Sequence, residues 1–312
     1  MVRHEIQMQD IIIIGAGVAG LTAGIYARRG NLKTLLLEGA FPGGQAFTID
    51  LVENWPGFPA GVRGGELSEL VFQQAQNLGV EIVYQSVVKL EKIADGFKVV
   101  TGQEEYQARS LIIATGALPK KLGVPGEAEF YQKGVSYCAT CDGALYRNKK
   151  VAVIGGGNTA IQEGLFLANL AAEVFVIHRR NEFRAAPLLV ERAKAKSNLS
   201  FITDTVVKEI RGEQTVKAVL LENVKTKDES LLDLDGVFVY VGFTPQSLMF
   251  KDFLECDENG YLLADEEMRT SMPGVFAAGD IRKKSLRQLI TAAADGAIAA
   301  VNATNYLLSG ML

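Results

Sequence analysis

An apolar strand that runs into a glycine-rich turn constrains the fold of this chain more than any other feature. The strand-like run at 10–14 is followed by Gly15, Gly17 and Gly20, a helical stretch to about residue 30, and a second strand at 34–37 that ends at Glu38. In such a unit one glycine permits the tight turn, one lets the backbone approach a pyrophosphate, and one lets the helix pack on the strand. The helix N-terminus supplies free N–H groups and a partial positive charge. The pattern therefore predicts a βαβ dinucleotide-binding unit.

The same pattern occurs again in the middle of the chain. A strand at 151–154 leads into Gly155 and Gly157, Ala160 takes the third position, and a strand at 174–177 ends at His178. Both copies place the residue that closes the second strand 23 positions after the first glycine, from 15 to 38 and from 155 to 178. One such match is weak support, because an ordinary strand–helix corner can produce it. Two matches in register predict two Rossmann-like units.

Two further segments share a pattern that is typical of domain boundaries. A buried strand at 110–115 ends in Gly116-Ala-Leu-Pro119, and a strand at 236–241 ends in Gly242-Phe-Thr-Pro245. A chain of 312 residues suits two domains. We therefore predict an α/β fold of two Rossmann-like, three-layer ββα domains, in which residues 119–245 are inserted into a discontinuous domain of residues 1–118 and 246–312. Alternating residues over 81–100 predict a small antiparallel sheet in the discontinuous domain.

Composition and charge exclude several classes of function. The chain is 48% apolar and 22% charged, as is ordinary for a globular protein, and its formal net charge of −4 gives no sign of binding to nucleic acid or anionic membranes. The basic pair Lys283-Lys284 is interpreted as a solvated turn. The uncharged run at 11–27 is short for a membrane span and is interrupted by glycines, so a buried strand turning into a helix explains it better. We expect a cytoplasmic protein without a targeting segment.

Cys138 and Cys141 form a C-x-x-C pair ten residues ahead of the second glycine unit. A zinc site would need further ligands, and outside the pair the chain offers only Cys256, His4 and His178 as thiol or imidazole ligands. We therefore predict no metal and a redox-active pair, since such thiols commonly have depressed pKa values and exchange through a mixed disulfide. Cys256 is predicted to be an inert thiol.

Three carboxylates follow strands or the dithiol at positions suited to chemistry. Glu38 closes the second strand of the first unit, where a carboxylate can accept hydrogen bonds from ribose hydroxyls. Asp280 follows an apolar strand and Gly279, where a carboxylate suits a polyol such as the ribityl chain of a flavin. Asp142 follows the dithiol and is a candidate proton donor or acceptor for a thiolate or reduced flavin. For Asp142 and Asp280 the alternative is a helix cap.

An arginine cluster marks the second unit. His178 stands where the first unit has Glu38, and Arg179, Arg180 and Arg184 follow it. An acidic residue there would repel a 2′-phosphate, whereas arginines hold one through charge-assisted hydrogen bonds. The cluster predicts NADP(H) rather than NAD(H), with a solvated basic turn as the alternative.

These ordered motifs resemble the low-molecular-weight thioredoxin reductases of the bacterial and archaeal type, in the class II pyridine nucleotide-disulfide oxidoreductase family, over nearly the whole chain. The dithiol lies in the predicted inserted domain, which distinguishes this family from glutathione-reductase-like enzymes. The matching segments are Gly15–Gly20, Pro42–Gln45, Glu53–Pro59, Ala114–Gly116, Cys138–Asp142, Gly155–Ala160, His178–Arg184, Pro273–Asp280 and Arg287-Gln288.

The resemblance implies FAD and NADPH as cofactors, bound in the discontinuous and the inserted domain respectively. For FAD it implies Gly15, Gly17, Val18, Ala19, Gly20, Glu38, Gly44, Gln45, Asn54, Val87, Ala114, Thr115, Gly116, Gly279, Asp280, Arg287 and Gln288. For NADPH it implies Gly155, Gly157, Asn158, Thr159, Ala160, His178, Arg179, Arg180 and Arg184.

The resemblance also implies the roles of the catalytic residues. Cys141 faces the flavin, Cys138 exchanges with the disulfide of thioredoxin or a thioredoxin-like protein, and Asp142 acts as acid or base. Family members are typically cytoplasmic homodimers whose inserted domain rotates between two half-reactions. The two G-x-x-P linkers are a plausible double hinge for that rotation.

This chain departs from the commonest family pattern at a few positions. Val18 replaces a frequent proline, Trp55 a phenylalanine, Gln162 a glutamate and Ala294 a glycine. None of them removes a catalytic group, although Gln162 bears on the nicotinamide side.

The alternative functions are those of four related proteins: a relative acting on another thioredoxin-like or small disulfide, one that passes electrons from small dithiols to oxygen, one that exchanges electrons with ferredoxin, and a non-catalytic nicotinamide sensor. The intact arginine cluster argues against the oxygen- and ferredoxin-linked relatives, and the cysteine pair against the sensor.

Overall fold

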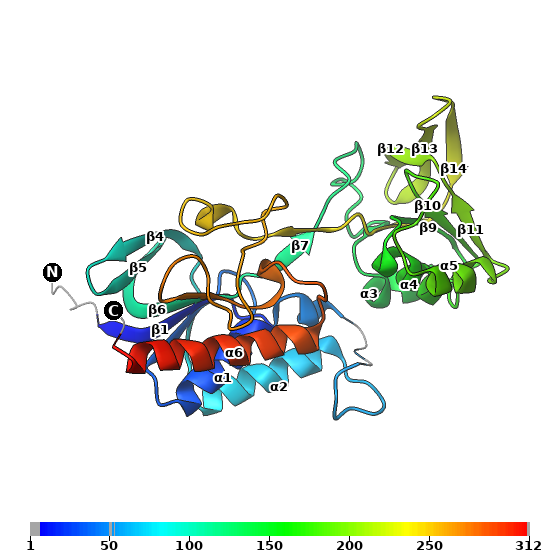
Figure 1. Ribbon diagram of the computed structural model, residues 1–312. Coiled ribbons are helices and arrows are strands. Elements are labelled where there is room, and N and C mark those ends of the chain that lie inside the picture. Colours follow the sequence, from blue (N-terminus) through cyan, green and yellow to red (C-terminus); the bar gives the residue numbers. More distant parts are fainter. Residues whose placement is uncertain (1–6, 50–51, 53, 311–312) are drawn as a thin grey trace. The chain divides into compact units, whose positions relative to one another are not determined.

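The computed structural model describes residues 7–49, 52 and 54–310 (Figure 1). The chain divides into two compact units, one made of Met1–Leu118 with Thr244–Leu312 and the other of Pro119–Phe243. No helix among the described residues has the length and apolar character needed to cross a bilayer.

The first unit is built on a seven-stranded sheet in the order β3-β2-β1-β6-β5-β4, with β17 also paired to β6. Strand β1 pairs in parallel with β2 and β6, and β17 adds a further parallel strand, so the carboxyl ends of these strands meet at one edge. The strands are β1 (Met8–Ile14), β2 (Thr34–Leu37), β3 (Glu81–Val83), β4 (Val87–Ile93), β5 (Gly96–Thr101), β6 (Glu105–Ile113) and β17 (Val275–Ala277).

The four isoleucines of β1 show why this strand is apolar throughout. Ile11 and Ile13 pack against the helices of the unit, whereas Ile12 and Ile14 pack on the opposite face against β4 and β5. A strand buried on both faces needs apolar side chains at every position rather than at alternate ones. Helices α1 (Val18–Arg29), α2 (Gly64–Asn77) and α6 (Leu289–Leu308) lie together on one face of the sheet (Figure 1). Short helices are η1 (Gly44–Thr48), η3 (Leu248–Phe250) and η4 (Gly279–Ile281).

The expectation of an antiparallel sheet over 81–100 is wrong for its first strand. Strand β3 pairs in parallel with β2, because it follows α2 in a strand–helix–strand crossover that returns the chain in the same direction. Strands β4 and β5 form an antiparallel hairpin that turns at Gly96, where φ is +137°. This hairpin extends the main sheet through β6 instead of forming a separate sheet.

The second unit has a parallel sheet in the order β11-β10-β9-β15-β8 and a three-stranded antiparallel sheet, β12-β13-β14. Its parallel strands are β8 (Val135–Ser136), β9 (Lys150–Ile154), β10 (Glu173–Ile177), β11 (Leu199–Ile202) and β15 (Gly236–Val239). The other elements are β12 (Thr205–Gly212), β13 (Val216–Asn223), β14 (Glu229–Asp233), α3 (Ala139–Asp142), η2 (Gly143–Tyr146), α4 (Asn158–Leu167) and α5 (Pro187–Lys194). Each unit thus contains the strand–turn–helix–strand arrangement that the repeated glycine pattern predicts.

The two G-x-x-P segments lie side by side. Strand β7 (Ala117–Pro119) pairs with β16 (Phe243–Pro245). The Lys120 amide donates to the Gly242 carbonyl at 2.9 Å, and the Gln246 amide donates to the Gly116 carbonyl at 3.0 Å. Gly116 and Gly242 have φ of +67° and +118°, a region that favours glycine, so both turns depend on these residues.

Candidate functional site

The turn between β1 and α1 contains two kinds of glycine. Two of them are needed by the fold itself, and one leaves room for a ligand. Gly15 has φ of +106°, and a Cβ there would lie 2.5 Å from the Ala114 carbonyl oxygen. A Cβ on Gly20 would collide with the Gly15 carbonyl oxygen. A Cβ on Gly17 would meet nothing within 4 Å, and α1 begins there without a side-chain cap. Free N–H groups facing open space are what a pyrophosphate requires.

Alanine at Gly15 should therefore lower the stability of the apoprotein, whereas alanine at Gly17 should lower its affinity for FAD. Gly15→Ala is expected to destabilise the apoprotein by about 1–3 kcal/mol from backbone strain alone. Gly17→Ala should leave the melting temperature of the apoprotein nearly unchanged but weaken FAD binding about ten- to a hundredfold, because a methyl group would displace charge-assisted contacts. Thermal unfolding and FAD titration of the apoprotein check both; an unchanged FAD affinity in Gly17→Ala would contradict this use of the turn.

A cavity of about 370 Å³ lies at this turn in the first unit. It brings together residues from four distant parts of the sequence. The predicted FAD residues that line it are Gly15, Gly17, Val18, Ala19, Glu38, Gly44, Gln45, Ala114, Thr115, Gly116, Gly279 and Asp280. Lining residues that the sequence did not predict include Phe41, Phe47 and Leu118.

Five of the predicted FAD residues are not among those that line this cavity: Gly20, Asn54, Val87, Arg287 and Gln288. Asn54 Nδ2 nevertheless donates to Gln288 Oε1 at 2.9 Å, which joins two predicted FAD residues 234 positions apart. Val87 pairs with Thr101 at the start of β4 and packs against the core. The guanidinium of Arg287 lies over the ring of Tyr261, 4.0 Å from its centroid.

Glu38 is fixed by backbone amides at the mouth of the turn. Its Oε2 accepts the Ala16 N–H at 2.6 Å and its Oε1 accepts the Ala40 N–H at 2.8 Å. Each carboxylate oxygen keeps a second lone pair, so a ribose hydroxyl can still donate to it. The open turn, the uncapped helix and this carboxylate together fit the adenosine and pyrophosphate parts of FAD.

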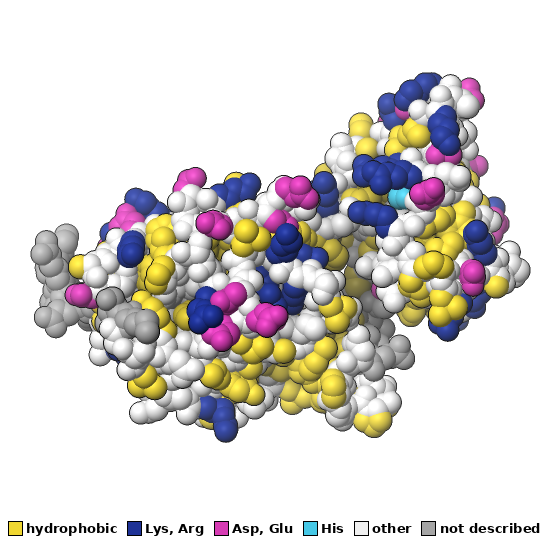
Figure 2. Space-filling model, in the orientation of Figure 1, with side chains coloured by type: hydrophobic (Ala, Val, Ile, Leu, Met, Phe, Trp, Pro, Cys, Tyr) yellow, Lys and Arg dark blue, Asp and Glu magenta, His cyan; other side chains and the backbone are white. Residues whose placement is uncertain are grey.

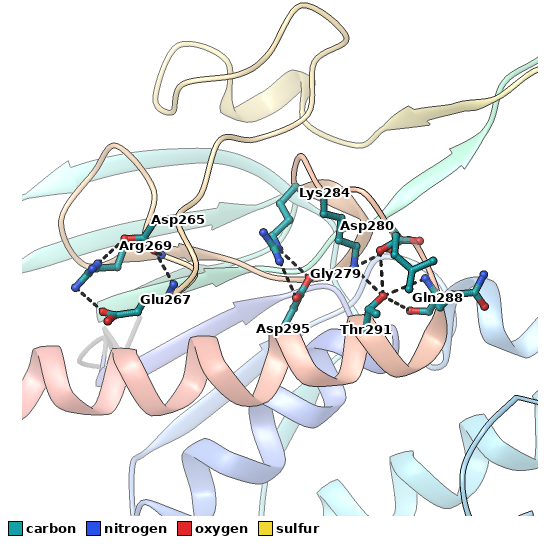
Figure 3. A network of polar contacts seen from close by, with 11 residues as sticks. Asp265, Glu267, Arg269, Gly279, Asp280, Lys284, Gln288, Thr291 and Asp295 are labelled. Carbon is teal, nitrogen blue, oxygen red and sulfur yellow. Dashed lines mark hydrogen bonds and ion pairs between the residues drawn. The ribbon is translucent and has the colours of Figure 1, made fainter. Parts of the chain in front are cut away.

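Asp280 lies in η4 and is joined to a lysine that the sequence did not assign to any site. Lys284 Nζ forms an ion pair with Asp280 Oδ1 at 3.2 Å (Figure 3). The side chain of Lys284 is only 7% exposed. The interpretation of Lys283-Lys284 as a solvated turn is therefore wrong for Lys284, whose ammonium pairs with the Asp280 carboxylate and with the buried carboxylate of Asp295; Lys283 is exposed. The helix at Asp280 has no side-chain cap, which disfavours a capping role.

A second cavity, of about 300 Å³, lies in the second unit at the turn between β9 and α4. Basic side chains gather around the histidine of this unit on the face shown in Figure 2. The predicted NADPH residues that line the cavity are Gly155, His178, Arg179 and Arg184, and four further lining residues are Gly156, Lys120, Lys121 and Tyr240. Such a basic cavity suits a ligand with several phosphates, one of them on a ribose.

The remaining predicted NADPH residues are Gly157, Asn158, Thr159, Ala160 and Arg180, and they do not line this cavity. A Cβ on Gly157 would meet nothing within 4 Å, and α4 begins there without a side-chain cap, as α1 does at its own open glycine. Asn158 Oδ1 accepts the Ala186 N–H at 2.7 Å, which ties the start of α4 to that of α5. Ala160 is fully buried and Arg180 is exposed.

His178 is packed so as to favour its neutral form. Its ring stacks on Phe183 with the centroids 5.2 Å apart, and a Cβ on Gly156 would collide with it. Burial lowers the pKa of His178, and the charges of Arg184 and Arg179 lower it further. A neutral imidazole leaves the positive charge of the cavity to the flanking arginines and lysines.

Two hydroxyl groups, of Ser136 and Tyr240, accept hydrogen bonds from backbone amides of the dithiol turn. Ser136 Oγ donates to Asp142 Oδ2 at 2.6 Å and accepts the Cys138 N–H at 3.0 Å. The hydroxyl of Tyr240 accepts the Ala139 N–H at 2.5 Å. Asp142 makes no side-chain cap to η2, so the capping alternative finds no support. The sequence did not predict Ser136 or Tyr240; no local pattern distinguishes either from an ordinary strand residue.

Cys138 is disulfide-bonded, and the side chain of Cys141 lies outside the described part of the structure. Cys256 is free, and burial raises the pKa of its thiol, which keeps the thiolate fraction low. Burial also raises the pKa of Glu163, in α4, to about 7. Of the two cysteines whose side chains the structure describes, the disulfide-bonded Cys138 is thus the one placed for redox chemistry.

Two glycine-turn cavities in Rossmann-like units, with a disulfide-bonded cysteine beside the second, define a dinucleotide-dependent disulfide oxidoreductase. The chain belongs to the pyridine nucleotide-disulphide oxidoreductase family, whose sequence model matches residues 9–296. Membership confirms the predicted enzyme class and the cofactors FAD and NADPH.

The chain is also similar to individual proteins over nearly its full length. A thioredoxin reductase of Treponema pallidum (strain Nichols) is 46% identical over 96% of this chain and 97% of that protein. A thioredoxin reductase of Bacillus subtilis (strain 168) is 45% identical over 97% of this chain and 96% of that protein. The crystal structure of Lactococcus lactis thioredoxin reductase matches with a TM-score of 0.87 at 42% identity, covering 96% of this chain and 99% of that one. These likenesses confirm the predicted resemblance and the α/β fold with two Rossmann-like domains.

Proposed function

We propose that this protein is an FAD-dependent NADPH:thioredoxin-disulfide reductase, in which the dithiol Cys138–Cys141 delivers electrons to a protein disulfide. The observation that carries the proposal is the double position of Tyr240. Tyr240 lines the basic cavity, and its hydroxyl accepts the Ala139 N–H inside the C-x-x-C turn. Tyr240, which directly follows β15, therefore joins the nucleotide cavity to the dithiol turn, which follows the neighbouring strand β8. FAD, when bound, supplies the two-electron relay between nicotinamide and disulfide.

The chain's own residues divide the remaining work. We assign FAD binding to residues 1–118 and 246–312, and NADPH binding with the dithiol to residues 119–245. Cys141 is assigned to the flavin side and Cys138 to exchange with the partner. Asp142 holds and moves a proton at its carboxylate, which Ser136 orients through the 2.6 Å hydrogen bond.

A thioredoxin or thioredoxin-like protein is the proposed partner rather than a small disulfide. The support is the likeness to thioredoxin reductases of Treponema pallidum and Bacillus subtilis, at 46% and 45% identity. We further propose a cytoplasmic homodimer, in keeping with the family.

Steady-state oxidation of NADPH by the FAD-loaded protein tests this function. We expect turnover with thioredoxin disulfide from the same cell, and much slower turnover with glutaredoxins, small disulfides or oxygen as acceptors. NADH should replace NADPH poorly. Rapid turnover with oxygen alone, or with small disulfides but no thioredoxin, would contradict the proposal.

We also propose that residues 119–245 rotate as a rigid body between two half-reactions. The chemistry requires it, because a nicotinamide and a disulfide cannot stack on the same flavin position, and the dithiol must also reach an external protein. The paired linkers with Gly116 and Gly242 at positive φ support a double hinge. A cross-link that locks the two domains should permit one half-reaction, either flavin reduction or disulfide reduction, and block the other. Full steady-state turnover by the locked enzyme would show that no rotation is needed.

A further inference from the structure

Four charged side chains form a compact network beneath the Gly279–Asp280 turn (Figure 3). At its centre is Asp295, on α6, which is 5% exposed. Asp295 Oδ1 accepts Arg282 Nη2 at 3.0 Å, and its Oδ2 accepts Arg282 Nε at 2.9 Å and Lys284 Nζ at 3.0 Å. The same Oδ2 accepts the backbone N–H of Gly279 at 3.0 Å.

Lys284 connects this buried carboxylate to the cavity. Its ammonium lies between Asp295, at 3.0 Å, and Asp280 Oδ1, at 3.2 Å, with Thr291 Oγ1 at 3.4 Å. Both Gly279 and Asp280 line the cavity of the first unit. Asp295 thus reaches the cavity by two routes, through the Gly279 amide and through the Lys284 ammonium.

The network is more than an ion pair that stabilises the fold. Buried ion pairs add little stability over well-packed apolar groups of similar size, because desolvation offsets their attraction. Here, however, Asp295 fixes the backbone amide of Gly279, just before Asp280. It also fixes the ammonium of Lys284, which in turn pairs with the Asp280 carboxylate. Burial raises the pKa of the Asp280 carboxyl, and the adjacent Lys284 opposes that rise.

We propose that Asp295 and Lys284 are positioning residues for FAD: they hold the Asp280 carboxylate where it can accept a hydroxyl of the flavin's polyol chain. The inference rests on the proposed placement of FAD in the first unit. Asp295 itself does not line the cavity, so it acts through Lys284 and Gly279. The binding site for FAD is therefore preorganised, and this lowers the free-energy cost of binding.

The same unit offers a matched control. Asp265, Glu267 and Arg269 form another cluster of ion pairs, with Arg269 Nε 2.8 Å from Asp265 Oδ2 (Figure 3). Asp265 and Arg269 have side chains 45% and 58% exposed, and neither lines the cavity. Asp265→Asn removes a carboxylate charge from an ion pair just as Asp295→Asn does, but away from Asp280.

FAD titration of the apoprotein tests the proposal, together with the melting temperatures of the apoprotein and the FAD-loaded protein. We expect Asp295→Asn, Lys284→Met and Asp280→Asn each to weaken FAD binding about tenfold or more, the loss expected for a charge-assisted contact. Asp265→Asn should stay within about twofold. Because Lys284 is one of the two routes by which Asp295 acts, the loss of FAD affinity in the double variant Asp295→Asn/Lys284→Met should be smaller than the two single losses combined.

A purely structural role for the network would give a different result. Asp295→Asn would then lower both melting temperatures equally and leave the FAD affinity within about twofold of the wild type, which would overturn the proposal. Should Asp295→Asn not fold, an unchanged affinity in Lys284→Met would overturn it equally. If Asp280→Asn also binds FAD normally, the placement of FAD itself fails, and that outcome is distinguishable from failure of the network alone.

Discussion

Serine at either cysteine of the C-x-x-C pair is expected to abolish thioredoxin reduction, with a loss on the order of 10³-fold or more. Exchange requires a thiolate that attacks a disulfide sulfur, and a serine hydroxyl cannot take part. Cys138→Ser and Cys141→Ser should nevertheless keep FAD bound and reducible by NADPH, because that half-reaction needs no sulfur. Thioredoxin-dependent NADPH oxidation and anaerobic reduction of the bound flavin measure the two halves separately.

Cys256→Ser is the matched control for these variants. Cys256 is a free, half-buried thiol outside the predicted redox pair. Its replacement should leave both half-reactions within about twofold of the wild type. Near-wild-type turnover with thioredoxin in either Cys138→Ser or Cys141→Ser would show that the dithiol is not the electron carrier.

Loss of the arginines in the second unit should change the preference between NADPH and NADH. Each charge-assisted contact to a 2′-phosphate is worth about 1.5–3 kcal/mol, or roughly ten- to a hundredfold in affinity. Replacing Arg179 and Arg180 together by glutamine should therefore raise the KM for NADPH far more than that for NADH. Arg179 lines the cavity and Arg180 does not, so the single variant Arg179→Gln should have the larger effect.

The control for the arginine variants is Arg192→Gln, which removes an exposed basic residue of α5 outside the cavity. Its KM for NADPH should be unchanged. Equal use of NADH and NADPH by the wild type would refute the assignment of this cluster to the 2′-phosphate.

Much of the fold could be predicted because it depends on local signals. The glycine spacing and the uninterrupted isoleucines of β1 report steric and burial constraints that act within a few residues. The direction of β3 could not be predicted in this way, because alternation along residues 81–83 shows only that a strand forms. Its partner, β2, is selected by the crossover through α2, which is a property of the whole sheet.

The site residues that belong to a chemical motif could be predicted from the sequence. Those that depend on contacts between residues far apart in the chain could not. The dithiol, the open glycines and the arginine cluster each have a residue pattern that their chemistry demands. Lys284 pairs with Asp295, which lies on α6 eleven positions later in the chain. Tyr240 meets Ala139 across the sheet, 101 positions away. No spacing along the chain indicates either contact, so sequence reasoning assigned Lys284 to solvent and overlooked Tyr240.

Anaerobic rapid mixing tests the central claim, the order of electron transfer, most directly. The FAD-loaded protein is first mixed with NADPH and then with excess oxidised thioredoxin, while flavin absorbance and free thiols are followed. The wild type receives two equivalents of NADPH, enough to reduce both its disulfide and its flavin, and Cys138→Ser receives one, because it has no disulfide to reduce. We predict that NADPH bleaches the flavin in the wild type and in Cys138→Ser, and that thioredoxin disulfide restores the absorbance with the appearance of thioredoxin thiols in the wild type only. Reoxidation of Cys138→Ser by thioredoxin at the wild-type rate, or no reoxidation of the wild type, would contradict the account.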